Sequence, residues 1–207
     1  MTDVNPRVIA ALEAQLRSWR RELEAGGGRV GWKVAYDIPE IEEVVGDEPV
    51  IGHLTTATLL DDGDSHSAAG ARALRAEVEL AVEAPGSGFA VALELVDVDP
   101  PQDDLEGIVA ANVFHRAVAL GGGRPDVPPA AQGRLLVNGE LREGARVSAD
   151  IGATPAVVAR QLEAVGERLE PGDRILTGAI ARVPVGAGDR VRAEIDGLGG
   201  VEVEISD

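Results

Sequence analysis

Residues 74–98 read LRAEVELAVEAPGSGFAVALELVDV, and they contain two apolar runs separated by a glycine-rich turn. Over residues 74–83, apolar side chains occupy every even position, whereas Glu77 and Glu79 lie at odd positions. Side chains two apart in a strand share one face. The alternation therefore predicts a half-buried strand with both glutamates on its polar face.

A second strand is predicted over residues 90–98, where its parity places Glu94 among small and apolar residues. A lone acid on an apolar face needs a partner. If the two strands pair as a simple hairpin, their apolar faces match, Glu79 lies opposite Glu94, and Glu77 follows two residues along that face. Opposed like charges destabilise a sheet, whereas three convergent carboxylates suit a hard divalent cation such as Mg²⁺ or Mn²⁺. The alternative is an ordinary solvated acidic face.

Composition limits the classes of protein that fit the chain. With 207 residues and 44% apolar composition, the chain is long enough to bury the core of one domain. A net charge of −17 repels a phosphate backbone and an anionic membrane surface, so neither nucleic acid nor membrane is expected as a partner. The start lacks the features of a secretory signal, which predicts a cytoplasmic protein. The absence of cysteine excludes disulfides, thiolate metal sites and cysteine nucleophiles.

One residue count points to a single position. Of the 19 basic residues, all are arginine except Lys33. Arginine stays protonated, whereas a desolvated lysine can lose its proton near neutral pH. The sole lysine therefore raises the question of what arginine would not do at this position. The alternative is a coding bias that left one lysine by chance.

Helices are expected at three places in the sequence. Asn5-Pro6 supplies an N-cap and a first-turn proline for a helix that ends at the glycines of residues 26–28. Thr154-Pro155 repeats this capping signature, and Gly166 ends the second helix. Residues 104–112 form a weaker third helix.

Two hairpins are expected in the C-terminal third of the chain. Asn138-Gly139 suits a type I′ turn, because both positions tolerate positive φ. Two alternating runs on either side of residues 196–200 predict a closing hairpin with one buried face. Its apolar residues are Val191, Ala193, Ile195, Val201, Val203 and Ile205.

In their order and spacing, these segments resemble the fumarylacetoacetate hydrolase superfamily, in its branch of 2-keto-4-pentenoate hydratases and 4-oxalocrotonate decarboxylases. The resemblance runs from about Gly31 to the C-terminus. It is densest in residues 135–140, 152–155, 169–179 (LEPGDRILTGA), 188–189 and 197–203. It implies an α+β fold, a mixed β-roll or barrel of the fumarylacetoacetate hydrolase type with peripheral helices. Residues 1–30 then form an N-terminal helical segment and residues 31–207 the catalytic domain.

The resemblance assigns roles to individual residues. Family members bind Mg²⁺ or Mn²⁺ through a Glu-x-Glu pair and a third glutamate on a later strand, which Glu77, Glu79 and Glu94 match. Their catalytic lysine lies in a Gly-x-Lys-x-Gly-like segment, matched by Lys33 in GWKVA. The resemblance implies that this lysine moves protons at the distal carbons of the substrate, with a pKa lowered by the pocket and the cation. Thr177 and Gly178 are expected to hold the substrate carboxylate.

The implied function is that of a divalent-metal-dependent lyase acting on a small unsaturated 2-oxo acid, as in 2-keto-4-pentenoate hydratase. A 4-oxalocrotonate decarboxylase-like enzyme is the first alternative. The second is a catalytically degenerate member that serves as a binding or scaffold subunit. The expected partners are the small-molecule 2-oxo acid and further subunits, as a homo-oligomer or as a mixed complex with a related enzyme.

Two segments depart from the family pattern. Hydratases commonly carry Pro-Asp-aromatic-Gly after the lysine, whereas Val50 stands at the position of the Asp, which decarboxylases also lack. His53 follows this segment and is a candidate substrate-binding residue in place of the missing polar group, or else a hydrogen-bonded structural histidine. The family segment Asp-Asn-Ala-Ser is reduced to Asn112, a second candidate for substrate binding. His115 and Arg116 replace small residues, so they fill the pocket or contact a neighbouring subunit.

Overall fold

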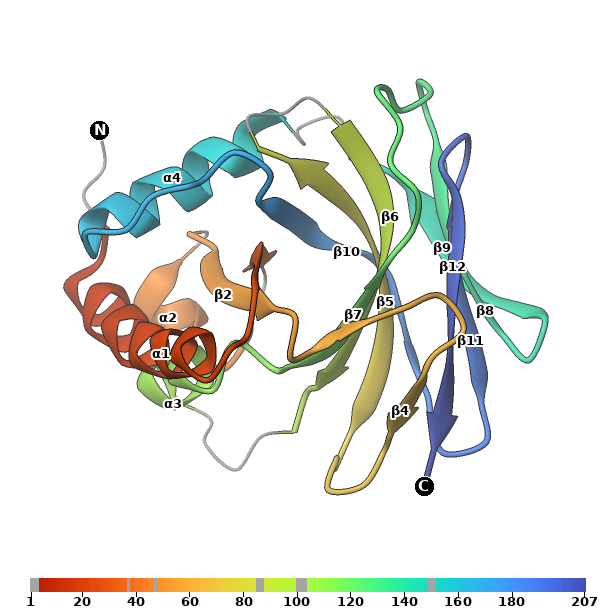
Figure 1. The fold of residues 1–207 in the computed structure, drawn as a ribbon, viewed down its shortest axis with the longest axis horizontal. Helices are drawn as coiled ribbons and strands as arrows, with labels where there is room; N and C mark the ends of the chain where they lie inside the picture. Colours follow the sequence, from red (N-terminus) through yellow and green to blue (C-terminus); the bar gives the residue numbers. More distant parts are fainter. Residues whose placement is uncertain (1–3, 37, 47, 85–87, 100–103, 149–151) are drawn as a thin grey trace.

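The strands form two sheets in the computed structural model, which describes residues 4–36, 38–46, 48–84, 88–99, 104–148 and 152–207 (Figure 1). The order in the seven-stranded sheet is β2-β1-β10-β5-β6-β7-β3. Its strands are β1 (Arg29–Ala35), β2 (Val50–Thr55), β3 (Leu59–Leu60), β5 (Leu74–Glu83), β6 (Gly88–Asp97), β7 (His115–Leu120) and β10 (Arg174–Pro184). The order in the five-stranded sheet is β4-β12-β11-β8-β9. Its strands are β4 (Ser65–Ser67), β8 (Gln132–Val137), β9 (Glu140–Arg146), β11 (Arg190–Ile195) and β12 (Gly199–Ser206).

The predicted glutamate hairpin lies in the middle of the first sheet as β5 and β6. Its register places Glu77 opposite Glu94, and Glu79 opposite Ala92. The register predicted from the sequence, with Glu79 opposite Glu94, is therefore wrong by two residues. Both registers match the apolar faces, because side chains repeat every two residues, and the hairpin turn includes residues 85–87, which lie outside the described residues. A shift of two residues leaves all three glutamates on one face.

The prediction of a half-buried strand is also wrong, because both faces of β5 are buried. The even-numbered face packs against the second sheet in a core that includes Leu80, Leu93 and Val203. The odd-numbered face meets the rest of its own sheet, which curls over it (Figure 1). The curl brings Lys33 on β1 to Glu94 on β6, although β10 and β5 lie between these two strands. The first sheet thus encloses its own polar face.

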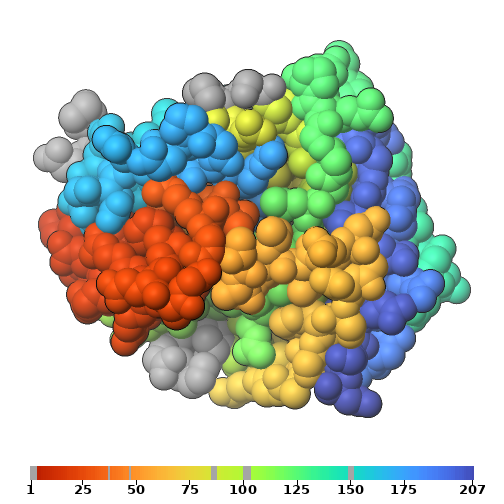
Figure 2. All heavy atoms as spheres, viewed as in Figure 1, coloured from red at the N-terminus to blue at the C-terminus, as the bar shows by residue number. Residues whose placement is uncertain are grey.

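Four helices in the described residues lie on the outer side of β1 and β2 (Figure 1). They are α1 (Pro6–Glu24), α2 (Glu42–Val45), α3 (Leu105–Ala110) and α4 (Thr154–Ala164). Helix α1 packs Leu12 and Leu16 into a second core together with Trp32. In the space-filling view, the red N-terminal part and the light-blue α4 segment lie side by side (Figure 2). Arg20 and Glu167 join them with an ion pair at 2.5 Å.

The cap predicted at Asn5 is confirmed, and the structure adds a cap at Asp104 that was not predicted. Asn5 accepts a hydrogen bond from the backbone of Arg7 at 2.9 Å, and Asp104 caps α3 in the same way. The predicted cap at Thr154 is wrong. The N-cap of α4 is Ala153, and Thr154 is buried within the helix. The reason is that the preceding residues already form a short 3₁₀ turn, so the helical path begins earlier than the capping pattern indicates.

Both predicted hairpins are confirmed. Asn138 and Gly139 have φ angles of 55° and 82°, as a type I′ turn requires, and they join β8 to β9. In the closing hairpin, Val191 on β11 pairs with Val203 on β12, and the six predicted apolar residues are all buried between the sheets. Two mixed sheets with a few external helices confirm the expected α+β β-roll. The division of the chain at residue 30 stays a prediction.

Within the described residues, no helix combines the length and the apolar character that a membrane span requires.

Candidate active site

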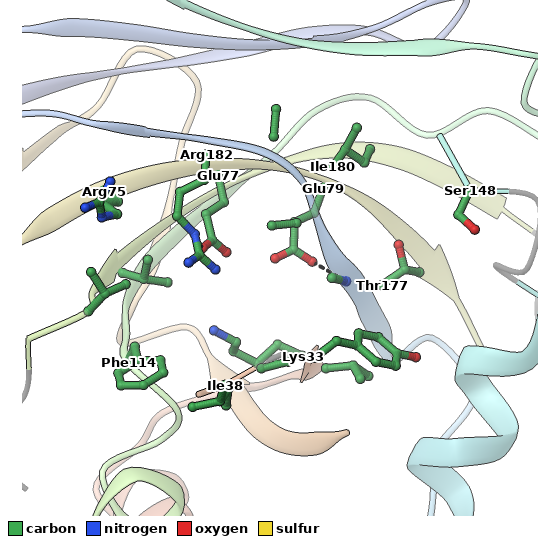
Figure 3. A pocket seen from close by; sticks show the side chains of 18 of the residues that line it. Lys33, Ile38, Arg75, Glu77, Glu79, Phe114, Ser148, Thr177, Ile180 and Arg182 are labelled. Atoms are coloured by element: carbon green, nitrogen blue, oxygen red, sulfur yellow. Dashed lines mark hydrogen bonds and ion pairs between the residues drawn. The ribbon is translucent and has the colours of Figure 1, made fainter. Parts of the chain in front are cut away.

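A cavity of about 920 Å³ opens on the glutamate face of β5, where the curl of the first sheet leaves room beneath the strand (Figure 3). Strands β1, β5 and β10 supply most of its wall, and β9, Tyr36 and residues 38–40 supply part of its rim. Several predicted site residues line it: Lys33, Glu77, Glu79, Thr177 and Gly178. Glu94 lies behind them, fully buried. The fold thus gathers in one place most of the residues that the sequence marked for chemistry.

The three glutamates converge closely enough to share one cation. One oxygen of each side chain lies within 4.8 Å of the other two, and all three residues are buried. Oε2 of Glu94 has no hydrogen-bond partner among the described residues. A buried carboxylate oxygen without a partner is rare in a native structure, and carboxylate oxygens are the preferred ligands of Mg²⁺ and Mn²⁺. The donor set therefore fits the expected divalent cation.

Lys33 lies across the cavity from β5, on the strand that the curl brings opposite. Its Nζ atom is 2.6 Å from Oε1 of Glu94 and donates a hydrogen bond to the carbonyl of Val113 at 3.0 Å. Only 3% of the side chain is exposed. The ammonium group is therefore held on two sides and shielded from bulk water, while it still faces the cavity (Figure 3).

The carbonyl that holds Lys33 belongs to a strained turn. Asn112, Val113 and Phe114 have φ angles of 63°, 52° and 66°, and three consecutive left-handed residues without glycine are unusual, above all at a β-branched valine. The Asn112 side chain stabilises the turn, because it accepts from the backbone N–H of His53 at 2.7 Å and donates to its carbonyl at 2.9 Å. A side chain at Gly52 would meet the Asn112 amide oxygen at 2.7 Å. Strain of this kind is typical of functional sites.

Two predicted substrate-binding residues, His53 and Asn112, lie outside the described cavity lining. His53 is part of strand β2. Its ring is buried, 3.4 Å from Oε1 of Glu22 on one side and 3.4 Å from the Gln15 amide on the other. Burial lowers its pKa despite the charge of Glu22. The structure thus places both residues where they support the segment around Lys33, which favours the structural alternative for His53.

Thr177 and Gly178 lie at an irregularity of strand β10, where its register against β5 shifts. Gly178 has a φ of 98°, a conformation that side chains rarely adopt, and Tyr36 packs 3.1 Å from the point where a Cβ atom would lie. The bulge turns the Gly178 N–H toward β5, where it donates to Oε2 of Glu79 at 2.7 Å (Figure 3). Thr177 donates to the carbonyl of Leu80 at 3.1 Å. Glycine at this position therefore orients one of the candidate ligands.

The three carboxylates of the cluster differ in the direction of their pKa shifts. Burial disfavours the charge of Glu94, but Lys33 and His115 outweigh it and lower the pKa of Glu94 to about 2. Burial and the charge of Glu94 raise the pKa of Glu77, and burial together with Glu94 and Glu77 raises the pKa of Glu79 well above its ordinary value. The protein's own groups therefore keep Glu94 ionised and favour a proton on Glu79.

The protein's own groups raise the pKa of Lys33 above its ordinary value. The expectation that the pocket lowers this pKa is therefore wrong. Burial does lower this pKa, but the nearby charges of Glu94, Glu77 and Glu79 outweigh the effect. The sequence motifs indicate a buried lysine near carboxylates. The direction of its pKa shift depends on the distances between the lysine and those carboxylates, which only the folded chain determines.

Two residues at the cluster were not assigned to it from the sequence. Arg182 lies opposite Glu77 in the pairing of β10 with β5, and its Nε atom donates to Oε1 of Glu77. Two register shifts in β10 place Arg182 opposite Glu77, whereas uninterrupted pairing from Leu176 and Ala81 would place it opposite Arg75, so a simple alternation does not predict this contact. His115 was expected to fill the pocket or contact another subunit. Instead, it is buried on the far side of Glu94, with Nδ1 2.7 Å from Oε1 of Glu94 and Nε2 2.9 Å from Oγ1 of Thr58.

The fold and the site together define a mixed β-roll that encloses a buried carboxylate cluster with a lysine beside it. A sequence profile described as fumarylacetoacetate (FAA) hydrolase C-terminal matches residues 87–206, which is more than half of the chain. The chain therefore belongs to the fumarylacetoacetate hydrolase family, as its motifs predicted. Glu94, Thr177 and Gly178 lie inside the matched region, whereas Lys33 and the Glu77–Glu79 pair precede it.

Solved structures with the same fold include enzymes of different activities. 4-Oxalocrotonate decarboxylase from Pseudomonas putida G7, complexed with magnesium and adipate, is 23% identical with a TM-score of 0.78, over 94% of this chain and 84% of that one. Fumarylpyruvate hydrolase from Pseudomonas aeruginosa, in complex with Mn²⁺ and pyruvate, is 19% identical with a TM-score of 0.62, over 86% and 90%. 2-Hydroxyhepta-2,4-diene-1,7-dioate isomerase from Mycobacterium marinum is 20% identical with a TM-score of 0.61, over 86% and 75%. At these identities the likeness establishes the fold, and the metals in the first two agree with the predicted cofactor.

Proposed function

We propose that this protein is a divalent-metal-dependent lyase that acts on a small unsaturated 2-oxo acid. The observation that carries the proposal is the convergence of three buried glutamates and one buried lysine on a single cavity. Buried groups with opposed pKa shifts are typical of catalytic sites. The structural neighbours include a decarboxylase, an isomerase and a hydrolase, which supports an enzymatic function.

Glu77, Glu79 and Glu94 are the proposed ligands of Mg²⁺ or Mn²⁺. When bound, this cation polarises the 2-oxo group and the neighbouring carboxylate of the substrate, and it stabilises the negative charge that develops there. Thr177 and Gly178 lie beside Glu79 on the cavity wall and are the proposed residues that hold the substrate carboxylate. In this structure the Gly178 N–H donates to Glu79 and the Thr177 hydroxyl to the Leu80 carbonyl, so both donors have to leave these partners when the carboxylate binds. Arg182 bonds to Glu77 from β10 and His115 bonds to Glu94 from β7, the two strands that flank β5 and β6.

Lys33 is the proposed proton-transfer residue. Its Nζ atom faces the cavity, and the carbonyl of Val113 and the carboxylate of Glu94 fix its direction. An ammonium group in this position can donate a proton to a distal carbon of the substrate and then take one back from another, which a guanidinium cannot do near neutral pH. Shielding from bulk water keeps the proton in the site.

Hydration and decarboxylation are both compatible with this arrangement, and one observation favours the second. A hydratase has to orient a water molecule, and the aspartate that hydratases of this branch commonly carry is replaced by Val50, which is buried and outside the described cavity lining. Apart from the proposed ligands, Glu40 at the rim is the one carboxylate among the described lining residues. The loss of this aspartate therefore favours a 4-oxalocrotonate decarboxylase-like activity, which is the main alternative to the 2-keto-4-pentenoate hydratase-like activity that the family motifs imply.

The test is turnover of 2-hydroxypenta-2,4-dienoate and of 2-oxo-3-hexenedioate by the Mg²⁺- or Mn²⁺-loaded protein, followed as loss of the ultraviolet absorbance of the conjugated chromophore. Lys33→Arg and Lys33→Met should be about equally damaging, with a loss of about 10²–10⁴ in turnover. Their affinity for Mn²⁺ should persist, because Lys33 is not a ligand.

Three outcomes would contradict parts of the proposal. If wild type turns over neither compound and still binds Mg²⁺ and oxalate, the protein is a binding or scaffold subunit of the family. If Lys33→Arg works nearly as well as wild type, Lys33 is a counter-ion and not the proton-transfer residue. If wild type binds no divalent cation at all, the metal-dependent mechanism is wrong. Assembly into a homo-oligomer or a mixed complex is a separate expectation, which sedimentation of the purified protein tests.

A further inference from the structure

The chain as a whole carries a net charge of −17, yet the described residues that line the cavity include four cations beside three glutamates. The cations are Lys33, Arg75, Arg146 and Arg182. Lys33 is already engaged by the glutamate cluster. Arg146 is exposed at the rim, which it shares with the exposed Glu40. The two remaining arginines lie next to the proposed metal ligands, and the proposed reaction does not use their charge.

Arg75 is on the same face of β5 as Glu77 and Glu79, because it precedes Glu77 by two residues. Its side chain is partly buried, and no hydrogen bond or ion pair joins it to any described residue. In a protein with almost twice as many acids as bases, an arginine on a cavity wall without an acidic partner is unusual. Its five N–H donors are free for a ligand.

Arg182 lies on the neighbouring strand, in the pairing position opposite Glu77, so the two arginines are diagonal neighbours on one face of the sheet. Its Nε atom bonds to Glu77, and no described residue accepts from its two terminal nitrogens. Almost half of the side chain, 47%, is exposed. Figure 3 shows Arg75 and Arg182 on the side of Glu77 that is away from Thr177.

The balance of charge indicates what these arginines bind. A divalent cation and Lys33 together neutralise the three glutamates, so Arg75 and Arg182 leave the loaded site with two uncompensated positive charges. We propose that Arg75 and Arg182 form a carboxylate-binding subsite, which makes a 2-oxo dicarboxylate the preferred ligand over a 2-oxo monocarboxylate. This inference rests on the proposed function, because the other end of the ligand is held at the metal site.

The geometry of the strand fits a ligand of this length. Same-face neighbours on a strand are about 7 Å apart, so Arg75 lies one such step beyond Glu77 and two beyond Glu79. A ligand whose 2-oxo end lies near Glu79 and Gly178 therefore directs a short carbon chain along β5 toward both guanidinium groups. Planar guanidinium groups bind carboxylates in two-point contacts, which gives the subsite selectivity as well as affinity.

The test compares two ligands that have the same carbon chain and differ in the second carboxylate. Calorimetry on the Mn²⁺-loaded protein measures the affinity for 2-oxoadipate and for 2-oxohexanoate, and neither has the carbon–carbon double bond that the proposed reaction requires. Wild type should bind 2-oxoadipate about tenfold or more tightly than 2-oxohexanoate, as a charged hydrogen-bonded contact predicts. Arg75→Met and Arg182→Met should each reduce this preference, and the double variant should reduce it to less than about threefold.

Binding of 2-oxohexanoate serves as the internal control, because damage to the metal site weakens both ligands alike and only the ratio of the two affinities reports the subsite. Arg146→Met is the matched control for a cavity arginine that belongs to β9 and not to β5 or β10, and it should keep the preference of wild type. Equal affinities of wild type for both ligands overturn the subsite and leave the proposed function standing. If Arg146→Met loses the preference to the same extent, the preference arises from the general positive potential of the cavity, and the proposed subsite is wrong. If the Mn²⁺-loaded protein binds neither ligand, the proposed function fails as well.

Discussion

Glu77 on β5 and Glu94 on β6 lie directly opposite each other across an antiparallel strand pair, and both are buried. Like charges in this arrangement destabilise a sheet, and burial increases the penalty. Two cations from distant strands offset it, since Lys33 pairs with Glu94 and Arg182 pairs with Glu77. Glu79 has no cationic partner among the described residues, and it accepts a backbone N–H instead. The three carboxylates exceed these two cations by one charge, so the cluster favours a bound cation.

The first prediction is that Glu79→Ala and Glu79→Gln weaken the binding of Mg²⁺ and Mn²⁺ by more than about tenfold, because the cation loses a charged ligand. Calorimetry with both metals measures the effect. Glu83→Gln is the matched control, since Glu83 lies on the same strand and pairs with Arg174 outside the cluster. Equal affinities of wild type and Glu79→Ala would show that the glutamates are not a metal site.

The second prediction concerns the pH dependence of metal binding. Burial and the charges of Glu94 and Glu77 raise the pKa of Glu79 well above its ordinary value. A cation binds the ionised carboxylate, so its binding has to displace the proton from Glu79. Metal affinity should therefore rise with pH and level off once the pH exceeds the raised pKa of Glu79.

Calorimetry at several values between about pH 5.5 and 8.5, in buffers with different ionisation enthalpies, measures both the affinity and the number of protons released. The Glu83→Gln control should behave as wild type. An affinity that is constant over this range, with no proton release, would contradict the shifted pKa of Glu79.

The third prediction is that Arg182→Met raises the affinity for Mn²⁺, by about three- to tenfold. The guanidinium group of Arg182 competes with the cation for Glu77 and repels it, and the methionine side chain does neither. Arg182 is half exposed, which is why the expected gain is modest. Arg190→Met removes an exposed arginine that pairs with Glu204 on the other sheet, so it should leave the metal affinity unchanged. A weaker affinity in Arg182→Met would mean that the arginine positions Glu77 for the metal more than it competes with it.

The fourth prediction tests the packing of the two sheets. Val203 is completely buried in the core between the sheets and pairs with Val191, so Val203→Asp places a charge there without a partner. The free energy of unfolding should fall by several kcal/mol, as measured by chemical or thermal denaturation. Glu204→Gln changes the exposed neighbour on the same strand and should have little effect. A melting temperature of Val203→Asp within about 2 °C of wild type would rule out a core position at Val203.

Features that depend on neighbours in the chain follow from the amino-acid sequence alone. The cap at Asn5, the turn at Asn138-Gly139 and the common face of Glu77 and Glu79 are all local, because backbone preferences and the two-residue period of a strand specify them. The family motifs placed Lys33 in the same site as these glutamates, and in the structure Lys33 pairs with Glu94 on that face.

Features that depend on distant segments required the tertiary structure. The pairing of Glu77 with Glu94 is not encoded in the alternation, because a register shift of two residues leaves every face unchanged. The bulge at Gly178 brings Arg182 to Glu77, and the packing of β7 against β6 brings His115 to Glu94. The burial of both faces of β5 arises from the curl of the sheet. A sequence pattern shows which side of a strand is polar, whereas only the folded chain determines what covers that side.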